Sequence, residues 1–127
     1  MLDWLMTPEI QTDPHHWWAT FGGHAAIGVA LWAFWAALGS LFRAPKETAL
    51  QITACAYAVW EAVQGYLGGY DIPDMAVDWI AVTGGAAVAW ALWSRRALAV
   101  AGVIAVVAMA GFAGASDAKK RKWGGPR

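Results

Sequence analysis

The feature that most constrains this chain is a long apolar run over residues 17–42, which contains no Asp, Glu, Lys or Arg. A helix that crosses a bilayer needs about 20 mostly apolar residues, so this run is long enough to span. Three further runs are similar, at residues 48–67, 75–93 and 97–115. Glu61 interrupts the first of these three, and Asp78 lies near the start of the next. The runs predict an all-α, polytopic transmembrane helical bundle with four spans, or three if one segment is re-entrant or interfacial.

The composition supports a membrane protein. Hydrophobic residues make up 59% of the 127 and charged residues 14%, with a mean hydropathy of +0.41, whereas soluble domains average about 45–50% and about 25%. The length allows one domain. The net charge is zero, so no electrostatic bias favours nucleic acid as a partner. Because Cys55 is the single cysteine, an internal disulfide and a multi-cysteine metal site are excluded.

Helix-boundary signals separate the apolar runs. Asp13 followed by Pro14 is typical of an N-cap and a first helical residue. Gly68 and Gly69 are suited to end the second helix, and Pro73 is suited to open the third. Polar connections occur at residues 43–47 and 94–96. We therefore expect an N-terminal interfacial segment at 1–16, a transmembrane helical domain at 17–115 and a basic polar tail at 116–127.

Basic residues indicate an orientation but do not fix the number of spans. Residues 1–42 and 68–75 hold no Lys or Arg, whereas the connections at 43–47 and 94–96 hold two each. The positive-inside rule then places the N-terminus outside and both basic connections in the cytoplasm, which predicts the cytoplasmic (inner) membrane. Four spans would put the basic tail outside as well, whereas three spans would put it inside. Both topologies stay open.

Four acidic residues, Glu61, Asp71, Asp74 and Asp78, lie in an apolar neighbourhood, and positions 47–94 contain no Lys or Arg. Glu61 and Gln64 share a helical face through their i, i+3 spacing. His24 lies at a similar depth, because a helix rises about 1.5 Å per residue. Intramembrane acids and histidines normally face a bundle interior or a water-filled cavity. The pattern predicts a polar intramembrane site made of His24, Glu61, Gln64, Asp74 and Asp78.

The same residues also admit structural roles. Asp71 and Asp74 are suited to cap the start of the third helix, where the helix dipole favours negative charge. His24 is suited to an interhelical hydrogen bond. Glu61 is hardest to explain in this way, because a charged carboxylate at the middle of a span costs about 3 kcal/mol. It should be neutral, paired or solvated in a cavity.

Small residues at a spacing of four indicate close helix packing, within one chain or between chains. The positions are Gly65, Gly69, Ala97, Ala101 and Ala105. Motifs typical of soluble enzymes are absent from the sequence: it has no G-x-S-x-G, no H-E-x-x-H, no P-loop and no G-x-G-x-x-G. We therefore expect no enzymatic activity, no cofactor and no metal ion.

The arrangement of polar residues resembles that of VanZ-like membrane proteins. The matching positions are Asp13, His24, Glu61-x-x-Gln64, Asp71, Asp74 and Asp78, ahead of Gly84 and Gly85. The chain departs from that pattern where the usual basic residue is replaced by residues 68–70 and the usual Asn by Asp78. The resemblance implies a role in the cell envelope or in glycopeptide resistance, with a polar pocket for a lipid or envelope precursor.

The architecture also resembles that of phage holins, which combine a few apolar spans, short connections and a hydrophilic basic tail. This resemblance implies a homo-oligomer that permeabilises the cytoplasmic membrane. It is the function expected first from the sequence, with the lipid bilayer and further copies of the chain as partners. The VanZ-like role is the alternative, and an accessory subunit of a larger membrane complex is a third.

Overall fold

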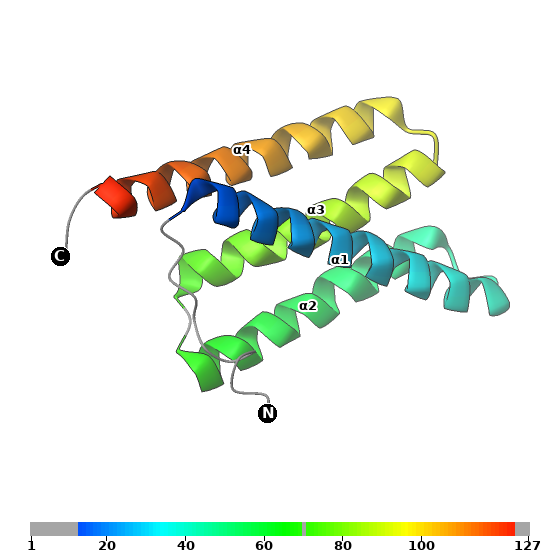
Figure 1. Ribbon diagram of the computed structural model, residues 1–127. Helices are drawn as coiled ribbons and strands as arrows, with labels where there is room; N and C mark the ends of the chain where they lie inside the picture. The colour runs from blue at the N-terminus through cyan, green and yellow to red at the C-terminus, as the bar shows by residue number, and fades with distance from the viewer. Residues whose placement is uncertain (1–12, 70, 124–127) are drawn as a thin grey trace.

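In a computed structural model, the described residues, 13–69 and 71–123, form four α-helices and no strand. These are α1 (Pro14–Leu41), α2 (Lys46–Gly68), α3 (Ile72–Trp93) and α4 (Ala97–Trp123). The helices run alternately in opposite directions (Figure 1). Three of them contain segments long and apolar enough to cross a membrane: Pro14–Leu41, Ile72–Trp93 and Leu98–Lys120. The prediction of an all-α helical membrane bundle is therefore confirmed, and the protein is a multi-pass membrane protein.

Most helix ends lie where the boundary signals placed them. The Asp13 carboxylate accepts a hydrogen bond from the His15 backbone N–H at 2.8 Å, which caps α1 just before Pro14. Gly69 ends α2 with a φ of 70°, a left-handed conformation that glycine adopts without steric strain. Asp71 takes the N-cap position of α3, and Pro73 lies in its first turn. The predicted N-terminal segment lies mostly outside the described residues.

The helices α1 and α3 form the centre of the bundle. Each contacts the other three helices, whereas α2 and α4 do not contact each other within the described residues. Glycines permit the close approach of the central pair: a Cβ atom on Gly28 would overlap the Val82 carbonyl group, and one on Gly85 would overlap the Ala25 carbonyl group. This reciprocal backbone contact between α1 and α3 is the type that small residues allow in membrane bundles.

In α2 the distribution of polar and apolar side chains is the reverse of that in a soluble protein. Its buried residues follow a spacing of four and are Ala49, Thr53, Tyr57 and Glu61. Its outward face carries large apolar side chains, among them Val59, Val63 and Leu67. A helix with a polar face inside and an apolar face outside is suited to lipid around the bundle.

Helix α4 continues past residue 115, where the sequence analysis placed the end of the transmembrane domain, and ends at Trp123. Its later part packs against the start of α1, because Gly111 and Gly114 make room for the rings of Trp18 and Trp17. Ala115 and Ala118 are buried. The first part of the basic tail is therefore helical, and residues 124–127 lie outside the described part.

The small residues proposed for helix packing have different surroundings. Gly65 lies against the Met75 side chain of α3. Gly69 has open space where a Cβ would stand, so it acts as a C-cap and not as a packing residue within the chain. Ala101 and Ala105 are exposed on the surface of α4. The side chain of Ala97 lies outside the described part.

A candidate polar site among three helices

A histidine–aspartate contact joins the two central helices. The His24 Nδ1 atom lies 3.5 Å from the Asp78 Oδ1 atom and 3.0 Å from the Thr20 carbonyl oxygen. Because a carbonyl oxygen only accepts, Nδ1 must carry a hydrogen, and in the neutral ring Nε2 is the acceptor. Both side chains are partly accessible, at 22% for His24 and 24% for Asp78. The contact is therefore not sealed inside the bundle.

Helix α2 contributes a buried tyrosine–glutamate pair to the same place. Glu61 is only 3% exposed and Tyr57 9%. The two side chains lie four residues apart on one face, and the Tyr57 hydroxyl is a hydrogen-bond partner of the Glu61 carboxyl group. The Tyr57 ring also packs edge-on against the His24 ring, with 6.3 Å between the ring centroids. Three helices therefore meet at this polar cluster.

The Glu61 carboxyl group is incompletely satisfied. Its Oε1 atom is buried and has no hydrogen-bond partner. A buried polar atom without a partner costs about 1–3 kcal/mol, and more for a charged group. The Glu61 Oε1 atom can therefore accept a hydrogen bond from a donor that the described side chains do not supply.

The cluster is acidic. Glu61 interacts electrostatically with Asp78, His24 and Asp74, of which only His24 can carry a positive charge. No Lys or Arg occurs at positions 47–94. Within the part of the chain that the structure describes, no group of three or more His, Cys, Asp or Glu side chains is arranged to hold a metal ion. Proton donors or a cationic group are the ligands that this site suits.

The structure thus brings together three of the five predicted site residues: His24, Glu61 and Asp78. Asp74 is exposed in the first turn of α3, near enough to Glu61 to act on it electrostatically. Gln64 is half-buried one turn further along α2 than Glu61. Sequence reasoning missed Tyr57, although its position four residues before Glu61 places both on one helical face.

The cluster lies inside the bundle but nearer to one end. At about 1.5 Å per residue, Asp78 is roughly 9 Å from the start of α3, Glu61 roughly 10 Å from the end of α2 and His24 roughly 15 Å from the start of α1. Those three helix ends lie at the same end of the bundle, together with the end of α4 (Figure 1).

A comparison with protein-family models, with curated proteins and with solved structures finds no match to this chain.

Proposed function

We propose that this chain is a protein of the cytoplasmic (inner) membrane whose polar cluster, formed by His24, Tyr57, Glu61 and Asp78, binds the head group of a lipid or lipid-linked envelope precursor. One observation carries the proposal. Polar groups from three helices converge inside a single protomer, and the Glu61 Oε1 atom among them is buried without a partner. A site completed within one chain suits a ligand better than it suits a pore formed by many copies.

The charge of the cluster selects the ligand class. Its carboxyl groups accept hydrogen bonds, and the nearby sequence offers no Lys or Arg to neutralise a phosphate. A head group that donates several hydrogen bonds, such as a sugar or a primary amine, matches these acceptors. A phosphate placed against Asp78 and Glu61 would be repelled. The resemblance to VanZ-like proteins supports an envelope ligand of this kind.

The test is to purify the full chain in a mild detergent and to identify the retained lipids by mass spectrometry. The wild-type protein should retain a lipid with a hydroxyl-rich or amine head group, and Glu61→Leu should retain roughly tenfold less, because a buried acceptor for the head group's hydrogen-bond donors is lost. Glu47→Leu is the control, since Glu47 is exposed in the first turn of the same helix. Circular dichroism checks that all three proteins are folded.

Two outcomes would remove this proposal. One is a wild-type protein that retains only bulk phospholipid in the proportions of the host membrane. The other is equal retention of the specific lipid by wild type and Glu61→Leu, which would place that lipid elsewhere on the bundle.

A second candidate is a holin-like protein that oligomerises and permeabilises the membrane, and one observation favours it. Ala101, Gly102 and Ala105 lie exposed on α4, and a Cβ at Gly102 would meet nothing within 4 Å. Small residues on an outer face allow helices of neighbouring copies to approach closely. Against it, the polar cluster faces the interior of the protomer, so a water-filled hole between copies would be lined mostly by apolar side chains.

A dye that reports membrane potential separates the two candidates after induced expression in a bacterial host. If the chain binds a ligand at its polar cluster and forms no pore, the membrane potential should stay constant even at high expression. Immunoblotting of the membrane fraction verifies the expression level. An abrupt collapse after a delay would indicate assembly above a threshold density and would support the holin-like candidate instead.

A further inference from the structure

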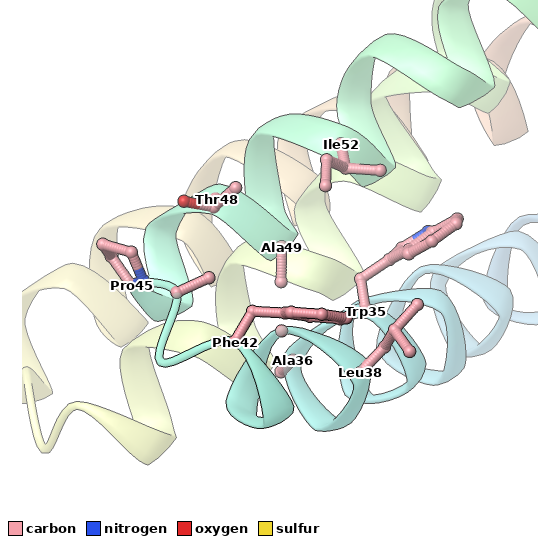
Figure 2. Close-up of a pocket in the computed structure, with 10 residues that line it drawn as sticks. Trp35, Ala36, Leu38, Phe42, Pro45, Thr48, Ala49 and Ile52 are labelled. Atoms are coloured by element: carbon pink, nitrogen blue, oxygen red, sulfur yellow. The ribbon is translucent and has the colours of Figure 1, made fainter.

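The opposite end of the bundle carries an apolar groove that the polar cluster does not use. It has a volume of about 230 Å³ and lies between the end of α1 and the start of α2 (Figure 2). Trp35, Leu38 and Phe42 line one side, and Ala49 and Ile52 line the other. Leu38, Phe42 and Ile52 are exposed, so the groove opens on the outer, lipid-facing surface. Its lining suits a hydrocarbon chain.

Two basic residues are immediate chain neighbours of residues that line this groove. Arg43 is exposed between Phe42 and Ala44, both of which line the groove. The Lys46 ammonium group donates a hydrogen bond to the carbonyl oxygen of Ala36, another lining residue, at 2.9 Å. The positive charge of Lys46 is therefore held against the backbone of a helix that forms one wall of the groove.

The α3–α4 connection adds two more positive charges at the same end of the bundle (Figure 1). Lys46 Nζ lies 5.9 Å from the centre of the Trp93 ring, which links the start of α2 to the end of α3. Arg95 is exposed two residues after Trp93 in the chain, and the Arg96 guanidinium group lies 4.9 Å from the centre of the Trp90 ring. Glu47, in the first turn of α2, is the one acidic residue within residues 42–47 and 94–96.

Two of these arginines occupy a conformation that favours glycine. Arg43 has a φ of 56° and Arg95 a φ of 54°, and each directly follows the C-cap of a helix. Glycine is the usual residue there because an L side chain is strained in the left-handed region. Both positions therefore combine a positive charge with a strained backbone conformation.

We propose that this end of the bundle is a binding site for an anionic phospholipid, with one acyl chain in the groove and the phosphate beside Arg43, Lys46 and Arg95. The groove supplies apolar contact and the connections supply charge complementarity, whereas a zwitterionic lipid would gain only the first. The site is separate from the acidic cluster and stands independently of the function proposed for it.

The test uses phosphatidylglycerol that carries a photoactivatable diazirine in its acyl chain, with the full chain reconstituted in phosphatidylcholine vesicles. Crosslinks mapped by mass spectrometry should fall within residues 35–52. Unlabelled phosphatidylglycerol should abolish them, and additional phosphatidylcholine should not. Labelling that phosphatidylcholine competes away equally, or that is spread evenly over the lipid-facing helices, would overturn the proposal.

Variants separate the contribution of charge from that of the groove. Arg43→Gln and Arg95→Gln should each weaken labelling about fivefold, the usual contribution of one basic residue near an anionic surface, whereas Arg43→Lys should keep it. The paired change Lys119→Gln with Lys120→Gln is the matched control, because both lysines are exposed near the other end of α4. Ile52→Trp keeps every charge but fills the groove, and it should lose the crosslinks at 35–52. Full labelling of Ile52→Trp, or an equal loss in the lysine control, would contradict the site.

Discussion

At the scale of single residues, the bundle depends on glycines at the crossing of α1 and α3. Gly28 and Gly85 each face a backbone carbonyl group of the other helix, at Val82 and Ala25. A backbone carbonyl group cannot rotate aside as the end of a flexible side chain can. An added methyl group must therefore push the two helices apart.

We therefore expect Gly28→Ala and Gly85→Ala to destabilise the protein by about 1–3 kcal/mol, the usual range for overpacking a tight contact. Gly102→Ala is the control, because open space surrounds that position. It should be neutral or slightly stabilising, since Ala favours a helix more than Gly does. Thermal unfolding in detergent measures all three. Equal midpoints for Gly28→Ala and Gly102→Ala would mean that the central helices are not in backbone contact.

A second residue-scale prediction concerns the tyrosine of the polar cluster. Tyr57→Phe removes the hydroxyl partner of Glu61 and leaves more of that buried carboxyl group unsatisfied. We expect a loss of about 1–3 kcal/mol in unfolding free energy and weaker retention of the head-group ligand. Tyr66→Phe removes a hydroxyl from the same helix at a residue that is 89% exposed. It should change neither property, and matching effects of the two variants would argue against a Tyr57–Glu61 pair.

The sequence predicts part of this residue-scale picture, and the limit has a physical cause. The proximity of His24, Glu61 and Asp78 follows from their depth along helices of known rise. The contacts of Gly28 with Val82 and of Gly85 with Ala25 do not, because many of the 14 glycines have small-residue neighbours at a suitable spacing. Which faces meet depends on how all four helices pack together. The sequence does not predict Tyr57 as a site residue, because a tyrosine in an apolar helix is most often an ordinary packing residue.

At the scale of elements, local signals define most helix ends but not the end of α4. Asp13 and Gly69 act through their own conformation and hydrogen bonds, so the sequence alone predicts them. The polar residues after position 115 suggested a tail, yet the helix continues to Trp123. Ala and Lys favour a helix, and the contacts of Gly111 and Gly114 with the Trp18 and Trp17 rings hold α4 against α1. Those contacts are tertiary and are not visible in sequence.

At the scale of elements, the outward face of helix α2 can be tested for contact with lipid. It is the one helix of the four without a segment apolar enough to count as a membrane span by composition. Nevertheless, its apolar side chains face outward and its polar ones inward. We expect Val59→Lys, which places a charge near the middle of the outward face, to reduce the amount of folded protein in the membrane, because a lysine there costs about 3 kcal/mol.

Two control variants complete this experiment. Val59→Leu keeps the face apolar, and Glu47→Lys places the same charge at the exposed start of the helix. Both should accumulate in the membrane fraction like wild type, as measured by immunoblot and by fluorescence size-exclusion chromatography. Normal accumulation of Val59→Lys would indicate that this face of α2 contacts water and not lipid.

At the scale of the whole molecule, the alternating helices place the start of α1 and the end of α4 at the same end of the bundle (Figure 1). This favours the four-span topology, because α2 lies in contact with both α1 and α3. The charges do not follow one simple rule, since basic residues occur at both ends of the bundle. The 27 residues of α4 measure about 40 Å, which exceeds a hydrocarbon core of about 30 Å. Lys119 and Lys120 can therefore reach the head groups.

Cysteine labelling tests this topology on intact cells in a Cys55→Ala background. His16→Cys and Lys119→Cys, both at exposed positions at the same end of the bundle, should react alike with an impermeant thiol reagent. Arg95→Cys, at the other end, should react only after the cells are permeabilised, because the positive-inside rule places that connection in the cytoplasm. Opposite reactivity of His16→Cys and Lys119→Cys would require three spans and would take α2 out of the transmembrane bundle. Reaction of Arg95→Cys alone on intact cells would be consistent with four spans but would show that the orientation is inverted. The polar cluster would then lie nearer the cytoplasmic side of the membrane. Its lipid ligand would have to come from the inner leaflet.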